Sequence, residues 1–152
     1  MKNERWRLLL VLCLWTVVAK AQDFAFATTD SVVTRLTELP ADRLTVLVFF
    51  DPECTTCRQE LFQMRHSSVL NQAVEKGRVQ VLTVCIEEDR EAWLKMCEEM
   101  PSRWIKGEST AEPFKLPAYD LTSLPATYLL DNDKQVLLRV RDYARLCELL
   151  KE

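Results

Sequence analysis

The feature that constrains this chain most is a run of apolar, β-branched and aromatic residues followed closely by two cysteines. The run is Leu44–Phe50, and the cysteines are Cys54 and Cys57. Runs of this kind are typical of strands buried on both faces of a sheet. Residues 51–53 break the strand, and the pattern after them predicts a helix that begins at or just after Cys54. We therefore expect the cysteine pair at the junction of a central strand and a helix.

The rest of the pattern predicts one α/β domain. A helical segment separates the strand at 44–50 from a second buried run at 79–86, and a right-handed crossover of this kind makes the two strands parallel. The other expected elements are a lead-in helix at 32–39 capped by Asp30 or Ser31, helices at 69–76 and 89–100, a β-hairpin of strands 126–130 and 135–140, and a closing helix at 142–150. Residues 101–123 receive no assignment.

The N-terminal residues have the organisation of a removable export signal. Lys2, Arg5 and Arg7 precede an apolar run at residues 8–19, and a small-x-small triplet ends at Ala21. The apolar run is shorter than the roughly 18 residues of a membrane-spanning helix, which favours cleavage after Ala21 over an uncleaved anchor. We expect a periplasmic or otherwise extracytoplasmic protein, without stable membrane insertion after cleavage.

The predicted mature domain, residues 22–152, is acidic. The whole chain has a formal net charge of −3, and the signal peptide at 1–21 contains four basic residues and one acidic residue, so cleavage leaves −6. Its basic residues are scattered singly among acids. This pattern argues against nucleic-acid binding, which needs a concentrated basic surface, and gives no support to binding of anionic membranes.

Two cysteines separated by two residues at a helix start are suited to thiol–disulfide exchange. The free N–H groups and the positive dipole of the helix N-terminus favour a thiolate at Cys54. We assign Cys54 as the nucleophile and Cys57 as the resolving thiol. Two other interpretations stay open, half of a zinc site and an inert structural bridge. The sole histidine, His66, is expected on the surface, and no metal or cofactor is expected.

Three stretches resemble the thioredoxin superfamily, specifically the exported bacterial thioredoxin-like proteins of the TlpA and ResA type. They are residues 46–57, residues 123–131, and the hairpin and helix that follow. The resemblance covers residues 30–152. It implies a thioredoxin-like fold, with a central mixed β-sheet flanked by helices and a C-terminal β-hairpin and helix.

The resemblance also implies roles for residues outside the cysteine pair. In that family the proline before the hairpin forms a cis peptide bond beside the active-site disulfide, and the residue before it binds substrate backbone. Here these residues are Pro125 and Leu124. A trans proline that opens a strand is the alternative.

The function that the resemblance implies is a thiol–disulfide oxidoreductase. Its partners would be thiols and disulfides of exported proteins together with a membrane electron donor, and reduction is preferred over oxidation. The alternative is a non-catalytic thioredoxin-fold binding module whose cysteines form a structural disulfide. A peroxidase is disfavoured because the chain has no Pro-x-x-x-Thr-x-x-Cys arrangement.

One position departs from the pattern of cytoplasmic thioredoxins. Those proteins have a buried aspartate on the central strand, where this chain has Val48. Asp51 and Glu53 are therefore the candidates for proton transfer, although acids in such a loop are more often solvated or act as caps.

The remaining cysteines and two tryptophans are expected to serve packing. Cys85, Cys97 and Cys147 lie on apolar faces, where cysteine behaves as a small hydrophobic residue. A second redox pair of Cys85 and Cys97 is the alternative. Trp93 and Trp104 are expected in the core, and shaping of a substrate groove is the other possibility.

Overall fold

The computed structural model describes residues 23–110 and 116–151. The predicted signal peptide, residues 1–21, lies outside the described residues, so its cleavage stays a prediction. Within the described ranges, no helix has the length and apolar character needed to cross a membrane.

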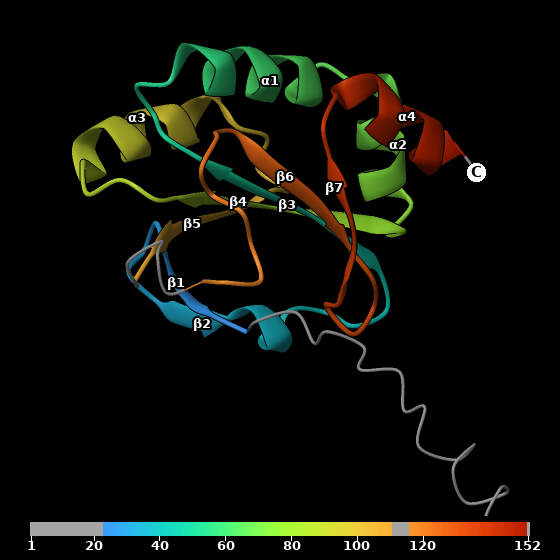
Figure 1. The fold of residues 1–152 in the computed structure, drawn as a ribbon, viewed down its shortest axis with the longest axis horizontal. Coiled ribbons are helices and arrows are strands. Elements are labelled where there is room, and N and C mark those ends of the chain that lie inside the picture. Colours follow the sequence, from blue (N-terminus) through green and yellow to red (C-terminus); the bar gives the residue numbers. More distant parts are fainter. Residues whose placement is uncertain (1–22, 111–115, 152) are drawn as a thin grey trace, which may run out of the picture.

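One mixed sheet organises the described residues (Figure 1). Its strands are β1 (Ala25–Thr28), β2 (Val33–Arg35), β3 (Leu44–Phe50), β4 (Val79–Cys85), β5 (Ile105–Ser109), β6 (Ala126–Leu130) and β7 (Val136–Val140). The helices are the 3-10 helix η1 (Leu36–Glu38), α1 (Thr55–Arg65), α2 (Ser68–Glu75), α3 (Arg90–Glu99) and α4 (Tyr143–Lys151). The strand order is β2-β1-β5-β4-β3-β6-β7. The β3–β4 and β4–β5 pairs are parallel, and the other pairs are antiparallel.

Strand β3 lies inside the sheet and separates two hydrophobic clusters. Successive side chains of a strand point to opposite faces. Val46, Val48 and Phe50 therefore pack against the helices, whereas Leu47 and Phe49 belong to the cluster on the opposite face. Figure 1 shows all four α-helices on one face of the sheet. Burial on both faces explains why this strand could be predicted from an unbroken apolar run.

Local capping fixes the helices between the parallel strands. Ser67 Oγ accepts a hydrogen bond from the Leu70 N–H at 3.2 Å, and Asp89 Oδ1 accepts one from the Ala92 N–H at 3.0 Å. These bonds satisfy N–H groups that have no partner inside a helix. Gly77, with φ of 69°, follows α2 in the left-handed region that glycine adopts readily. The expected parallel crossover between β3 and β4 is confirmed.

The predicted lead-in helix at 32–39 is wrong. Ser31 has φ of 64°, so it does not cap a helix but turns the chain back, and Val33 then pairs with Ala27 of β1. Only the short η1 follows. Leu36 and Leu39 of the predicted stripe are buried, whereas Val32 and Val33 are exposed. The neighbouring backbone of β1 gives these β-branched residues a strand partner, and pairing outweighs the apparent helical spacing.

The C-terminal part agrees with the prediction except for one strand. Strands β6 and β7 form the expected antiparallel hairpin, and α4 closes the chain. Strand β5 lies within the stretch that received no assignment. It contains one large apolar residue, Ile105, and is a strand because both β4 and β1 pair with it.

Candidate active site

The cysteine pair lies where β3 passes into α1. Cys54 is the N-cap of α1, and its Sγ accepts a hydrogen bond from the Cys57 N–H at 3.2 Å. The Cys54 N–H in turn donates to the Asp51 carbonyl at 3.2 Å. The strand therefore ends in a tight loop that aims the Cys54 sulfur at the open end of the helix, where positive dipole favours an anion.

The two sulfurs have different surroundings. Cys54 is half-buried, whereas Cys57 has no exposed surface and packs with the helix-side core. Burial, and next a hydrogen bond to Cys54, raise the pKa of the Cys57 thiol to about 12. Cys57 therefore stays protonated at neutral pH. Both cysteines are free thiols.

A distant loop completes the site. The Leu124–Pro125 peptide bond is cis. The Leu124 carbonyl oxygen lies 4.0 Å from the Cys54 Sγ, across 70 residues of sequence. The structure thus brings Leu124 and Pro125 to the cysteine pair.

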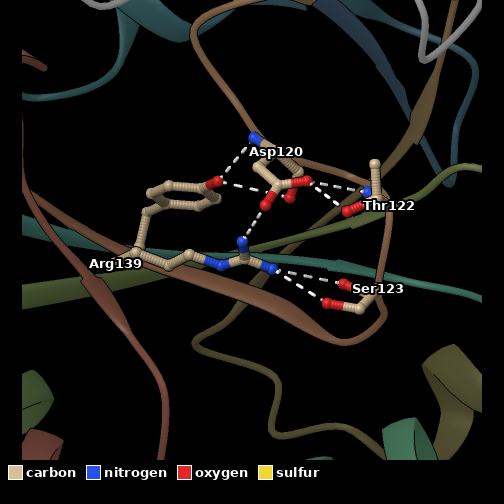
Figure 2. Close-up of polar contacts among 5 residues, drawn as sticks. Asp120, Thr122, Ser123 and Arg139 are labelled. Atoms are coloured by element: carbon tan, nitrogen blue, oxygen red, sulfur yellow. Dashed lines mark hydrogen bonds and ion pairs between the residues drawn. The ribbon is translucent and has the colours of Figure 1, made fainter.

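A polar network holds the chain just before this loop (Figure 2). The Arg139 guanidinium pairs with the Asp120 carboxylate and donates to the Ser123 Oγ at 3.1 Å. The Asp120 N–H donates to the Tyr128 hydroxyl at 2.7 Å. Hydrogen bonds from Thr122, and then the Arg139 guanidinium, lower the pKa of Asp120 to about 2. Strands β6 and β7 thereby clamp the segment that carries Leu124.

The two candidate proton-transfer residues differ in position. The Asp51 carboxylate is half-buried and accepts a hydrogen bond from the Glu53 N–H at 2.7 Å. Its negative charge is among the lesser causes that raise the pKa of Cys57 and of Cys85, which places it near both thiols. The Glu53 side chain is exposed.

Glu60 is an acid of the site that the sequence analysis missed. It lies on α1 one turn after Cys57 and accepts a hydrogen bond from Thr127 Oγ1 at 2.7 Å. Thr127 pairs with Val48, the strand position where a buried acid was sought. Burial is the main cause that raises the pKa of Glu60. The position three residues after Cys57 was a usable signal, because residues three apart lie on neighbouring parts of a helix surface.

The other three cysteines of the described residues are also free thiols. Cys85 and Cys97 are buried free thiols, and burial raises the pKa of each to about 11. Cys147 is half-buried, and its Sγ lies 3.8 Å from the Ser67 Oγ.

The two tryptophans and the histidine are accounted for by ordinary positions. Trp93 and Trp104 are buried, as expected for core residues. His66 is exposed at the end of α1, where its Nδ1 lies 2.8 Å from the Phe62 carbonyl oxygen. The described residues contain no group of three or more potential metal ligands.

The sheet, its flanking helices and the cysteine pair at the strand-to-helix junction define a thioredoxin-like fold. Residues 17–140 match the AhpC/TSA family, and this chain belongs to that family. No curated protein sequence matches the chain significantly. Assignment to the TlpA and ResA type stays a prediction.

Solved structures with a similar fold include three proteins from Bacteroides species. A thioredoxin-like protein from Bacteroides caccae is 26% identical, with a TM-score of 0.79; the match covers 90% of this chain and 49% of that one, so this chain spans about half of its length. A conserved Bacteroides fragilis protein of unknown function is 32% identical over 86% of this chain and 96% of its own, with a TM-score of 0.77. The thioredoxin domain of a Bacteroides vulgatus thiol-disulfide oxidoreductase shares the fold at 18% identity, with a TM-score of 0.75 over 88% and 94% of the two chains.

Proposed function

We propose that this protein is a thiol–disulfide oxidoreductase that acts on cysteines of exported proteins, with reduction as the preferred direction. One observation carries the proposal. Cys54 is accessible at a helix start, directly over the buried Cys57 and against the Leu124 carbonyl. A helix start favours negative charge, while burial keeps the second thiol protonated.

The proposed reaction has two exchanges. The Cys54 thiolate attacks one sulfur of a client disulfide, a Cys54–client disulfide forms, and the other client sulfur leaves as a thiolate that takes a proton. Cys57 then loses its proton and attacks the Cys54 sulfur, which releases the second client thiol. The Cys54–Cys57 disulfide forms, and two electrons have passed to the client.

The neighbouring residues have proposed roles in these steps. Asp51 is the proposed acceptor of the Cys57 proton, because its charge acts on that thiol. Glu53, which is exposed, would pass the proton to solvent. Leu124 and Pro125 would bind client backbone beside Cys54.

The same proposal includes the protein's surroundings. Removal of residues 1–21 would release the domain into the periplasm or another extracytoplasmic space. A membrane electron donor would return Cys54 and Cys57 to thiols after each cycle. Protein thiols and disulfides are the proposed partners, and the acidic composition argues against nucleic acid.

Trapping and redox titration test this proposal. The Cys57→Ser variant should hold clients as mixed disulfides that a thiol reductant releases, and the Cys54→Ser control should hold none. Titration against glutathione should show an exchangeable Cys54/Cys57 couple. A bridge that resists reduction below about −300 mV, together with no trapped client, would instead indicate a structural disulfide in a binding module.

A further inference from the structure

A cavity of about 490 Å³ lies between α1 and α3, beside the cysteine loop. Leu61 and Met100, both buried, and the half-buried Met96 form its apolar part. Phe62 stands at its edge with 54% of its surface exposed. The two helices lie side by side in Figure 1, and we call the space between them the α1–α3 groove.

The groove reaches the loop that precedes Cys54. Pro52, two residues before Cys54, lines it, and so does Arg58, whose Nε donates to the Pro52 carbonyl at 2.6 Å. The Arg58 N–H donates to the Cys54 carbonyl at 3.1 Å. Residues four apart lie on one helix face, so Arg58 and Phe62, which both line the groove, follow Cys54 along one side of α1.

The groove is more basic than the protein around it. Arg58, Arg65 and Lys95 line it together with one acid, Glu99. Arg65 pairs with Glu99 at 2.9 Å, whereas Arg58 and Lys95 have no carboxylate partner among the residues that the structure describes. In a chain with a formal net charge of −3, two such cations beside an apolar floor are complementary to a segment that is both apolar and acidic.

We propose that the α1–α3 groove binds the client segment next to the cysteine joined to Cys54, and that it prefers apolar and acidic residues there. The proposal rests on the proposed function, since the client is the disulfide partner of Cys54. The groove would give the client a second binding contact, in addition to the Leu124–Pro125 loop. Client selection then comes from the charge and size of neighbouring residues.

Synthetic peptides activated as 2-pyridyl disulfides provide the test. Each peptide has one central cysteine, and the residues on both sides of it differ among three designs. The acidic apolar peptide has Leu, Phe, Asp and Glu there, and the basic apolar peptide has Leu, Phe and Lys. The acidic polar peptide has Ser, Asp and Glu. In the reduced Cys57→Ser protein, the Cys54 thiolate attacks the peptide sulfur, a Cys54–peptide disulfide forms, and 2-thiopyridone leaves. Its absorbance gives the rate constant. Each value is divided by that for neutral 2-hydroxyethyl 2-pyridyl disulfide, so a general change in Cys54 reactivity cancels.

The acidic apolar peptide should react about fivefold faster than the basic one at low salt, with the ratio falling towards one as salt is raised. Lys95→Glu should remove that ratio, and Phe62→Ser should remove the advantage over the Ser-containing peptide. Two variants outside the groove are matched controls: Lys76→Glu reverses an exposed charge at the end of α2, and Leu137→Ser replaces a side chain that is 53% exposed on β7. Both should keep the wild-type ratios.

The outcomes separate the two proposals. Equal rates for the three peptides, or a loss of preference in Lys76→Glu as large as that in Lys95→Glu, would overturn the groove while the oxidoreductase stands. A protein that does not react even with the neutral small disulfide would overturn the oxidoreductase, and the groove proposal falls with it.

Discussion

At the scale of single residues, the site depends on an unequal pair of thiols. Cys54 is reached by solvent, whereas Cys57 is sealed in the helix-side core and keeps its proton. In the proposed exchange this difference sets the order of attack, because only Cys54 has a surface that a client could reach. Burial is the largest cause of the raised pKa of Cys57, and the hydrogen bond to Cys54 and the charge of Asp51 add to it.

Alkylation of the reduced protein tests this order. At about pH 8, iodoacetamide should modify Cys54 while Cys57 stays unmodified, because a thiol with a pKa of about 12 has on the order of one part in 10⁴ as thiolate at that pH. Peptide mass spectrometry of samples quenched over time measures both sites. Buried Cys85 is the internal reference for a protected thiol. Modification of Cys57 as early as Cys54 would contradict the assignment of roles.

Glu60 gives a second prediction at this scale. Burial raises its pKa above the ordinary 4.5, so the fold favours the protonated form. Its stabilising contribution is therefore complete below about pH 4.5 and is lost as the pH rises through the folded value. Glu60→Gln keeps an acceptor for Thr127 but carries no charge. The variant should be more stable than wild type at pH 8, and the difference should shrink towards pH 4.

Thermal unfolding at a series of pH values measures this effect. Glu53→Gln is the control, because the Glu53 side chain is exposed and its replacement should leave the curve unchanged. A Glu60→Gln variant that is less stable than wild type at pH 8 would show that the carboxylate is stabilised in the fold.

At the scale of elements, the hairpin of β6 and β7 supports the site through Arg139. This side chain lies on β7 and binds Asp120 and Ser123 of the loop that leads to Leu124. Its guanidinium also lies 5.9 Å from the Tyr128 ring centre on β6. A hairpin that would otherwise only extend the sheet thus restrains the loop facing Cys54.

Arg139→Gln should loosen this loop with little loss of global stability. An ion pair of partial exposure contributes about 0–1 kcal/mol, so the free energy of unfolding in urea should fall by no more than about 1 kcal/mol. Backbone amide exchange at 120–124 should nevertheless become faster, and client trapping by the Cys57→Ser protein slower. Arg145→Gln, which removes an exposed pair with Glu148, should change none of these.

How well each strand could be predicted from the sequence depends on how many of its faces are buried. Strands β3 and β4 are buried on both faces, and their apolar composition records this directly. Strand β5 has the composition of a loop and is defined by the backbones on both of its sides. Single-sequence patterns contain no information about such pairing. The same reason explains why the strand at Val33 was taken for a helix.

The site divides in the same way. Cys54 and Cys57 could be predicted because two cysteines separated by two residues are suited to thiol–disulfide exchange. Pro125 could be predicted because it lies in a motif that resembles the thioredoxin superfamily. Glu60 was missed because an acid on a helix is usually solvated, and only the fold reveals that Thr127 lies opposite it. The Arg139 contacts join residues from separate elements and have no local signature.

At the scale of the whole molecule, the sheet divides the interior into two clusters with different contents. The helix-side cluster contains Cys57, and Cys54 packs against it. The opposite cluster is aromatic: Phe24, Phe49 and Tyr119 contact one another, with ring centres 5.1 to 5.8 Å apart. This cluster joins the N-terminal strands to the loop before Leu124. Residues far from the site in sequence therefore pack behind it.

Gly107→Ala tests how tightly β1 is attached to this interior. A Cβ at Gly107 would lie 2.6 Å from the Phe26 ring, which is fully buried, so the ring must shift. We expect a loss of about 1–3 kcal/mol in the free energy of unfolding, measured in urea. In a Phe26→Val background the added loss should be smaller, because the ring carbon that makes the 2.6 Å contact is absent.

Gly77→Ala is the comparison for a purely conformational cost. No atom lies within 4 Å of its added Cβ, but its φ of 69° strains any residue with a side chain. The loss of stability caused by Gly77→Ala should be the same with Phe or Val at position 26. An equal Gly107→Ala penalty in both backgrounds would mean that Phe26 is not what the new methyl group meets.

The separation of 70 residues between Cys54 and Leu124 also determines when the site can form during synthesis. A chain that emerges from its N-terminus presents both cysteines well before the loop that faces them has been made. Until β6 pairs with β3, the two thiols lie on an incomplete sheet and are accessible to oxidants and to other cysteines. The complete site proposed for thiol–disulfide exchange therefore forms only after β6 has paired with β3.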